Sequence, residues 1–451
     1  MKLTSNYQTG FNGYPKQPPA LLTRPERYTD LTITPTHRAC IARGLGGSYG
    51  DAALNQKQHV VLTERLDRLL FFDPQRGMIC AEAGISLQKL LNFTVPQGWF
   101  LPVTPGTKQV TLGGCVAADI HGKNHPQEGS IGQHLLELEL ITAQGKRIIC
   151  SKGQEASLFW ASVGGMGLTG IIGTITLQLK AIQTSYLVLQ QKSATDLSHT
   201  LAYLAQANQH PYEYAVAWLD CLNPPWHHSI IQYARHATLD DNLSCQQRLN
   251  PLANAVQKPY LIPMALPTSL LHPSLIKSFN RYYFKSMLRK ADHYIAHYSA
   301  YCYPLDQLAH WPRLYGPSGF IQYQCALPNP NADRVIKKLL ASLREKNCPV
   351  YLATLKYFGD ESPAWLSFPL PGFSLALDLP MRPDLLSCLD DVDSLVAAAG
   401  GRVYLAKDAR LKPEMFRAMY PRHPTWLAIK HHWDPEQQFS SSLSRRLKLT
   451  A

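Results

Sequence analysis

The stretch GTKQVTLGGCVAADIHGKNH, residues 106–125, combines four glycines, two histidines, two lysines and one aspartate with a few small apolar residues. Neither a packed helix nor a buried strand favours this mixture, because glycine inside either element costs conformational entropy and leaves no side chain to pack. Glycine also lets the backbone approach another group without a side chain in between. The stretch therefore indicates a loop that lies very close to another molecule.

Two more glycine clusters occur in the first third of the chain, RGLGGSYGD at 43–51 and GGMGLTG at 164–170. The first has Tyr49 where the dinucleotide fingerprint G-x-G-x-x-G requires its last glycine, and HGKN at 121–124 does not satisfy the Walker pattern. The last contains G-x-G-x-x-G, but a predicted helix precedes it and a predicted strand follows it, the reverse of a Rossmann unit. Each cluster alone is typical of a turn. Together they indicate backbone N–H groups that reach a long ligand with a diphosphate, such as a dinucleotide held without a Rossmann helix.

The composition is that of a globular protein with two domains. Of the 451 residues, 45% are hydrophobic and 17% are charged, and single cores stop growing near about 250–300 residues. The ten cysteines form no C-x-x-C pair and no apolar signal segment opens the chain, so we expect reduced thiols and a cytoplasmic location. The longest apolar tract, 260–276, contains three prolines and is shorter than the roughly 20 residues that cross a bilayer.

The net charge of +12 is compatible with nucleic acid, an anionic membrane face or a phosphorylated substrate as partner. The sequence contains no zinc-knuckle, RNA-binding or helix-turn-helix pattern, so we do not expect it to bind nucleic acid.

Residues 251–300 combine apolar bulk, broken by prolines, with aromatic residues interleaved among Lys277, Arg281, Lys285, Arg289 and Lys290. Aromatic side chains settle at membrane interfaces, and cations are attracted to anionic leaflets. This pattern predicts a mobile, membrane-facing edge and hence peripheral contact with the inner face of the membrane. An ordinary packed helix with its basic face in water is the alternative.

Local patterns predict an α+β fold. Strands are expected over 59–64, 68–73, 78–84 and 171–180, a hairpin over 135–150 about Gln144 and Gly145, and helices over 86–98 and from 155 until the glycines at 164. Ser86 is the predicted N-cap of the first helix and Gly98 ends it. Glycine density falls after residue 180 and glycine and lysine return after 400, which predicts three segments: 1–180, 181–400, and a tail, 401–451, that returns to the first.

Four stretches in the same order carry a family resemblance: RGLGGSYGDAA (43–53), LPVTPGTKQVTLGGCVAADIHGKNHPQEGSIG (101–132), GGMGLTGIIGTITL (164–177) and GGRVYLAKDARLKPEMFRAMYP (400–421). They resemble the FAD-linked oxidase family typified by vanillyl-alcohol oxidase and p-cresol methylhydroxylase. Within that family they are most similar to the decaprenylphosphoryl-ribose oxidases, the flavin subunits of a 2-epimerase. The resemblance extends from about residue 30 to 449. It implies a two-lobed α+β FAD-binding domain over 1–180 and a second α+β domain over 181–400, whose antiparallel sheet roofs the flavin above the substrate.

The resemblance also implies which residues contact FAD. The first loop would wrap the pyrophosphate, Gly106 and the 111–114 loop would continue that wall, residues 118–121 would run beside the flavin, and 171–173 would lie by the adenosine, with Tyr404 arriving from the tail. The full set is Ala42, Arg43, Gly44, Leu45, Gly46, Gly47, Ser48, Tyr49, Gly50, Asp51, Ala52, Gly106, Thr111, Leu112, Gly113, Gly114, Ala118, Asp119, Ile120, His121, Ile171, Ile172, Gly173 and Tyr404.

The first loop departs from many relatives of this family. Covalent members carry a histidine where this sequence has Gly46 and Gly47, so the resemblance implies that FAD is bound non-covalently. His121 comes from a different loop. It is expected either to contact the reacting groups or to hydrogen-bond to backbone behind them.

By resemblance, the activity is oxidation of a sugar hydroxyl to a ketone by hydride transfer to flavin N5, at C2 of a polyprenyl-phosphate pentose. Lys407 matches the family lysine near the sugar hydroxyl, and a partly desolvated lysine has a lowered pKa that suits a base or an electrostatic clamp. The alternative for Lys407 is a surface lysine paired with Asp408. Lys407 and His121 are the expected catalytic residues.

The expected substrate pocket is carried over from the same family. Gln322 and Gln324 share one side of a strand by their spacing of two, and Ala376 stands where the mycobacterial enzymes have a cysteine, so no reactive thiol is expected there. Lys123 and Tyr49 complete a ring around the substrate. The full set is Tyr49, Lys123, Trp218, Tyr303, Gln322, Gln324, Ser374 and Ala376.

Two other functions are weighed against this one. A binding or scaffold protein would need neither intact flavin loops nor Lys407. An aldonolactone or alditol oxidase acting on a soluble sugar or polyol is the nearer alternative, but such relatives typically carry the covalent histidine. The epimerase resemblance further implies an NADH-dependent keto-reductase as partner.

Overall fold

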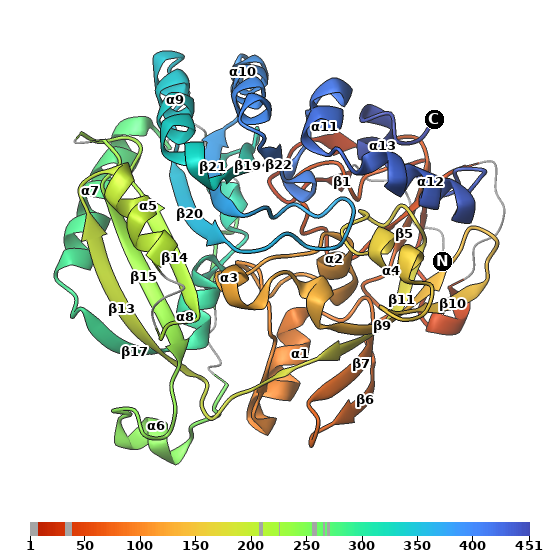
Figure 1. The fold of residues 1–451 in the computed structure, drawn as a ribbon, viewed down its shortest axis with the longest axis horizontal. Helices are drawn as coiled ribbons and strands as arrows, with labels where there is room; N and C mark the ends of the chain where they lie inside the picture. The colour runs from red at the N-terminus through yellow and green to blue at the C-terminus, as the bar shows by residue number, and fades with distance from the viewer. Residues whose placement is uncertain are drawn as a thin grey trace.

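A computed structural model describes residues 8–31, 38–206, 211–224, 226–254, 259–264, 267 and 271–451. Helices and strands mix throughout, so the predicted α+β class is confirmed. Figure 1 shows a large sheet with its helices at one side of the molecule and two smaller sheets at the other. The C-terminus lies on the side with the smaller sheets.

The smaller sheets come from the first 180 residues. One is parallel, in the order β3-β5-β4, and the other is antiparallel, in the order β10-β9-β11-β7-β6. Their strands are β3 (Leu21–Thr23), β4 (Cys40–Arg43), β5 (His59–Leu62), β6 (Leu69–Asp73), β7 (Met78–Glu82), β9 (Leu135–Ile141), β10 (Arg147–Cys150) and β11 (Ile171–Gln178). Three helices accompany them: α1 (Leu87–Thr94), α2 (Leu112–Ala117) and α4 (Ala156–Ser162).

The local predictions for this part are confirmed in type, and several elements are shorter than predicted, the first helix by the largest margin. The Ser86 side chain accepts the Lys89 N–H at the start of α1, and Gly98 has a left-handed φ of +81° where the chain leaves the helix. The α-helix itself ends at Thr94, and residues 95–97 form a 3-10 turn. Pro96 explains the early end, because proline has no N–H to continue the helical hydrogen bonds.

The large sheet is antiparallel, in the order β17-β13-β15-β14-β20-β21-β19-β22. Helices α5, α9 and α10 cover one of its faces (Figure 1). Its strands are β13 (Tyr186–Ala194), β14 (Tyr214–Leu219), β15 (Ser229–His236), β17 (His293–His297), β19 (Phe320–Pro328), β20 (Leu352–Phe358), β21 (Gly372–Pro380) and β22 (Arg402–Val403). The helices are α5 (Leu197–Ala205), α9 (Ala332–Glu345) and α10 (Leu385–Ala398).

The last fifty residues leave the large sheet and cross to the smaller ones. After β22 the chain forms α11 (Pro413–Met419), α12 (His423–Trp433) and α13 (Ser442–Arg446). Helix α12 packs on α4, where the Trp426 indole donates to the Ala161 carbonyl at 2.9 Å. One cluster of buried apolar side chains runs through both sides of the molecule, from Leu22 to Leu449. The division of the chain at residues 180 and 400 stays a prediction.

The region predicted to face a membrane contains α7 (Pro273–Leu288). Residues 255–258, 265, 266 and 268–270 of that region lie outside the described residues. No helix in the described part of the chain has the length and apolar character needed to span a bilayer. All ten cysteines are free thiols.

Candidate active site

The glycine loops and the uncovered face of the large sheet enclose one cavity of about 760 Å³. Its wall on the loop side includes 44–49, 105–107 and 113–115. Its wall on the sheet side includes alternate residues of β14, β19, β20 and β21, and α7 contributes Phe279, Tyr283 and Met287. A cavity of this size is within the range of sites that hold cofactors and large ligands.

The glycines of the loops are required by close packing and by the cavity. A Cβ on Gly44 would lie 2.2 Å from the Thr111 hydroxyl, and a Cβ on Gly47 would lie 2.5 Å from Val110. A Cβ on Gly106 would meet no atom within 4 Å, because this residue borders the cavity. The loops thus pack tightly on each other while their backbone lines an open trough, which fits the extended diphosphate of a dinucleotide.

The tail holds the first glycine loop in place. The Tyr49 N–H donates to the Ala406 carbonyl at 2.9 Å. The Arg446 guanidinium binds Asp51 through two N–H groups, at 2.7 and 2.9 Å, and lies 2.9 Å from the Asp408 carboxylate. Both carboxylates are buried. Asp408 is therefore the partner of Arg446 and does not pair with Lys407 on the surface.

Lys407 lies inside the cavity. Its Nζ is 5.2 Å from the centre of the Tyr49 ring. Burial lowers the pKa of Lys407 to about 8, and the Asp378 carboxylate opposes that shift. Asp378, on β21, is buried, its Oδ1 accepts a hydrogen bond from the Gln322 amide at 2.5 Å, and burial raises its pKa to about 6. A lysine with this pKa can take up or release a proton near neutral pH.

His121 is held by side chains and not by backbone. The Gln324 Nε2 lies 3.0 Å from His121 Nε2 and also donates to the Ser374 hydroxyl at 2.8 Å. Since an amide nitrogen donates, His121 Nε2 is the acceptor and the ring proton lies on Nδ1. The rings of Phe358, Phe368 and Tyr404 surround the imidazole. Burial, with the charge of Lys356 adding to it, holds the pKa of His121 well below its usual range, so the ring is neutral.

Lys123 and Lys356 reach the same part of the cavity from opposite sides. The Lys123 ammonium donates to the Tyr301 carbonyl and lies 4.0 Å from the centre of the Tyr301 ring. Burial lowers the pKa of Lys123 to about 8 and that of Lys356 to about 7, and the charges of Lys407 and Lys123 lower the pKa of Lys356 further.

Most of the residues expected at FAD line the cavity. They are Ala42, Gly44, Leu45, Gly46, Gly47, Ser48, Tyr49, Ala52, Gly106, Thr111, Gly113, Gly114, Ala118, Ile120, His121, Ile172 and Tyr404.

The others in that set lie behind the wall and support it. Asp119 accepts the Gly132 N–H at 3.0 Å and the Ser367 hydroxyl at 2.6 Å, and Arg43 donates to the carbonyls of Thr9 and Ala53. A side chain on Gly50 would meet the Asp408 backbone, and a side chain on Gly173 would meet the Tyr28 ring. The expected contacts that do not line the cavity are Arg43, Gly50, Asp51, Leu112, Asp119, Ile171 and Gly173.

The expected substrate residues divide in the same way. Tyr49, Lys123, Trp218, Gln322, Gln324 and Ala376 line the cavity. Tyr303 is buried, with its hydroxyl 2.5 Å from that of Thr104, and Ser374 is buried behind Gln324. Tyr303 and Ser374 therefore lie behind the cavity wall and support it, and their polar groups are paired inside the protein.

Sequence reasoning missed Asp378 and Lys356. Both were detectable, because each continues an alternation along a strand. Ser374, Ala376 and Asp378 have the same parity on β21, and Leu352, Thr354 and Lys356 have the same parity on β20. Such a spacing of two puts the last residue of each set on the same face as the others.

Comparison with known proteins agrees with this geometry. The family described as FAD binding domain matches residues 33–151. Decaprenylphosphoryl-β-D-ribose oxidase of Mycolicibacterium smegmatis is 35% identical over 418 residues, which cover 91% of this chain and 90% of that protein. An uncharacterized protein of Streptomyces coelicolor is 36% identical over 81% of this chain and 100% of its own length. L-gulonolactone oxidase of Scyliorhinus torazame is 22% identical over 88% of this chain and 86% of its own.

Proposed function

We propose, since this chain belongs to the FAD-linked oxidase family that includes decaprenylphosphoryl-β-D-ribose oxidase, that it oxidises C2 of a polyprenyl-phosphate pentose to a ketone. FAD is its cofactor, and its reaction is oxidation of an alcohol group. The observation that carries the proposal is the position of Lys407, whose ammonium lies in the cavity that the glycine loops border.

Different residues of the cavity have different roles in the proposed reaction. FAD, when bound, supplies the hydride acceptor for the oxidation. The glycine loops would hold its diphosphate, and the large sheet would roof the flavin. Lys407 takes the proton of the reacting hydroxyl, because its pKa of about 8 leaves a usable neutral fraction near pH 7. Gln324 and the neutral His121 orient the sugar by hydrogen bonds.

FAD binding is non-covalent in this proposal. The first loop has glycine at 46 and 47, and a left-handed φ of +71° at Gly46 disfavours any side chain there. The Nε2 of His121 accepts a hydrogen bond from Gln324, and three aromatic rings pack around the imidazole. Its Nδ1 has no hydrogen-bond partner among the described residues and is left to orient the sugar.

A soluble sugar or lactone is the less favoured substrate. The L-gulonolactone oxidase of Scyliorhinus torazame, which matches over 88% of this chain, is only 22% identical, and one end of the cavity here is apolar. Phe279, Tyr283 and Met287 of α7 line that end, together with Trp218 of β14. An apolar entrance beside a polar floor suits a substrate with a hydrocarbon tail and a sugar head.

The decisive experiment is anaerobic reduction of the bound flavin, followed by absorbance. A short-chain polyprenyl-phosphate pentose should bleach the flavin, whereas gulonolactone and free alditols at equal concentration should not. Bleaching by the soluble compounds alone would refute the proposed substrate. A keto-reductase that uses NADH would complete an epimerisation, so adding one with NADH should convert the ketone to the epimeric alcohol.

A further inference from the structure

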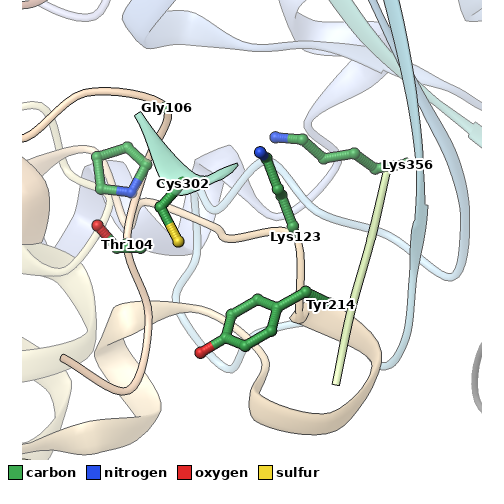
Figure 2. Close-up of a pocket in the computed structure, with 7 residues that line it drawn as sticks. Thr104, Gly106, Lys123, Tyr214, Cys302 and Lys356 are labelled. Carbon is green, nitrogen blue, oxygen red and sulfur yellow. The ribbon is translucent and has the colours of Figure 1, made fainter. Parts of the chain in front are cut away.

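A small recess of about 20 Å³ extends the cavity beside the loop at 104–106 (Figure 2). Pro105, Gly106, Lys123, Cys302 and Lys356 line both the recess and the large cavity, so the two spaces are continuous. Figure 2 shows the side chains of Lys123 and Lys356 ending in the same space. Lys123 comes from the glycine-loop side and Lys356 from β20, and the charge of Lys123 lowers the pKa of Lys356.

The recess carries positive charge that no acidic group balances. Among the described residues, no carboxylate affects the pKa of Lys123 or of Lys356. The acidic group that opposes the lowered pKa of Lys123 is the Cys302 thiol, whose own pKa burial raises to about 11, so this thiol is neutral at pH 7. Asp378 acts on Lys407 instead. Burial and the neighbouring lysines bring the pKa of Lys356 to about 7, and an anion bound between the two amines would favour their charged forms.

The residues that hold Lys123 leave part of its ammonium available. One N–H of Lys123 donates to the Tyr301 carbonyl, and an ammonium has three N–H donors. On the other side, Leu352, Thr354 and Lys356 line the cavity along β20, so the wall changes from apolar to cationic toward the recess. A ligand with an oxyanion next to an apolar chain matches this order.

We propose that Lys123 and Lys356 form an anion subsite that binds the phosphoryl group of the substrate. The proposal rests on the proposed function, because it places the phosphate of a polyprenyl-phosphate sugar. It also assigns Lys356 a role that differs from that of Lys407: Lys356 binds and orients the substrate, and Lys407 acts on the proton of the reacting hydroxyl.

The first test uses the FAD-loaded protein and inorganic phosphate as probe. Phosphate is titrated at constant ionic strength against chloride, and binding is measured by calorimetry and by the change in flavin absorbance. We expect saturable binding that Lys356→Met and Lys123→Met each weaken at least tenfold, while Lys356→Arg stays within threefold of the wild type. Lys338→Met, an exposed lysine on α9, is the matched control and should change nothing.

Several results would overturn the subsite. One is wild-type phosphate affinity in Lys356→Met with normal FAD content. Another is phosphate binding that occurs only in the FAD-free protein, because this would mean that the two lysines bind the cofactor and not the substrate. A third is a holoprotein that binds phosphate no better than chloride.

The second test separates the subsite from the proposed reaction. With a short-chain polyprenyl-phosphate pentose, Lys356→Met should raise KM at least tenfold and change kcat less. A pentose 1-phosphate should compete with inorganic phosphate for the subsite. Its affinity is compared with that of the lipid-linked sugar phosphate, and tighter binding of the lipid-linked compound would show that the lipid adds affinity. If no sugar reduces the flavin while phosphate still binds through Lys356, the proposed reaction fails and the subsite stands.

Discussion

The buried Asp378 carboxylate and the Lys407 ammonium, which lines the cavity, shift each other's pKa. Burial raises the pKa of Asp378 to about 6, and the hydrogen bond from Gln322 and the charge of Lys407 oppose that rise. Burial lowers the pKa of Lys407 to about 8, and Asp378 opposes that fall. The carboxylate therefore sets the pH at which Lys407 becomes neutral.

Asp378→Asn should move the pH dependence of flavin reduction to lower pH. Without the negative charge, the pKa of Lys407 falls below about 8, and a lysine that acts as base then becomes neutral at lower pH. The measurement is the rate of anaerobic flavin reduction by saturating substrate between pH 6 and about 9.5. Asp360→Asn, an exposed aspartate, is the control. A rate that falls instead of rising as the pH passes the pKa of Lys407 would mean that Lys407 acts as a cation, and a profile that Asp378→Asn leaves unmoved would contradict the coupling.

Lys407→Met should retain FAD and lose catalysis. The glycine loops that border the cofactor trough do not include residue 407, so the protein should stay yellow. Loss of a general base commonly costs about 10²–10⁴-fold in rate, and we expect at least about 100-fold slower flavin reduction by stopped flow. Lys412→Met, on the surface of the same tail, should react like the wild type. A Lys407→Met rate within about threefold of the wild type, worth well under 1 kcal/mol of barrier, would remove Lys407 from the mechanism.

The sequence predicted the parts of this site that depend on local pattern. The glycines at 44, 46 and 47, the cap at Ser86 and the alternation of Gln322 and Gln324 each follow from the backbone conformation or the period of one element. Lys407 was identified by a motif in the tail. Each of these signals lies within about ten residues.

Whether a buried polar side chain faces the cavity or a protein partner depends on pairings between distant segments. Tyr303 was expected to line the pocket, but its hydroxyl is used by Thr104 from 199 residues away. Asp119 was expected at the cofactor, but its carboxylate is used by Ser367 from 248 residues away. Residue type shows that such a group needs a partner when buried. Only the fold shows whether a protein group or a ligand supplies it.

Arg446→Leu should destabilise the protein and weaken FAD binding together. Arg446 is the counter-charge of two buried carboxylates, Asp51 in the glycine loop and Asp408 in the tail. Removing one partner of a buried ion pair typically costs about 3–5 kcal/mol, because the remaining charge is left uncompensated. We expect a lower urea midpoint and a higher Kd for FAD. Arg417→Leu, on the exposed face of α11, should leave both unchanged. An unchanged urea midpoint in Arg446→Leu would contradict the stabilising role of Arg446.

Denaturation by acid or heat should release all of the FAD. No histidine occupies residues 46 or 47, and the environment of His121 leaves it engaged with Gln324. The measurement is flavin absorbance in the supernatant after precipitation, compared with the flavin content of the native protein. Flavin that stays with the precipitated chain would show a covalent bond.

We expect the protein to bind anionic membranes through α7, because apolar and basic side chains of this helix are exposed. Only Asn280 and Met287 of this helix are buried, while Leu275, Phe279, Tyr282 and Leu288 are 51–71% exposed. Phe279 also lines the cavity, so the mouth of the site opens at this helix. An ordinary packed helix, the alternative from sequence, would bury more of its apolar side chains. Lys277, Arg281, Lys285 and Arg289 are exposed on the same segment.

Sedimentation with anionic vesicles tests this surface. Each cation near an anionic leaflet contributes about 1 kcal/mol, so replacing Lys277, Arg281, Lys285 and Arg289 by glutamine should abolish co-sedimentation at physiological salt. Lys290 is left unchanged because it lines the cavity. The matched control replaces four exposed cations elsewhere, Lys57, Lys146, Lys338 and Arg417, and has the same net charge. Equal loss in both variants would mean that total charge drives binding, and undiminished binding in the α7 variant would exclude this helix as the contact.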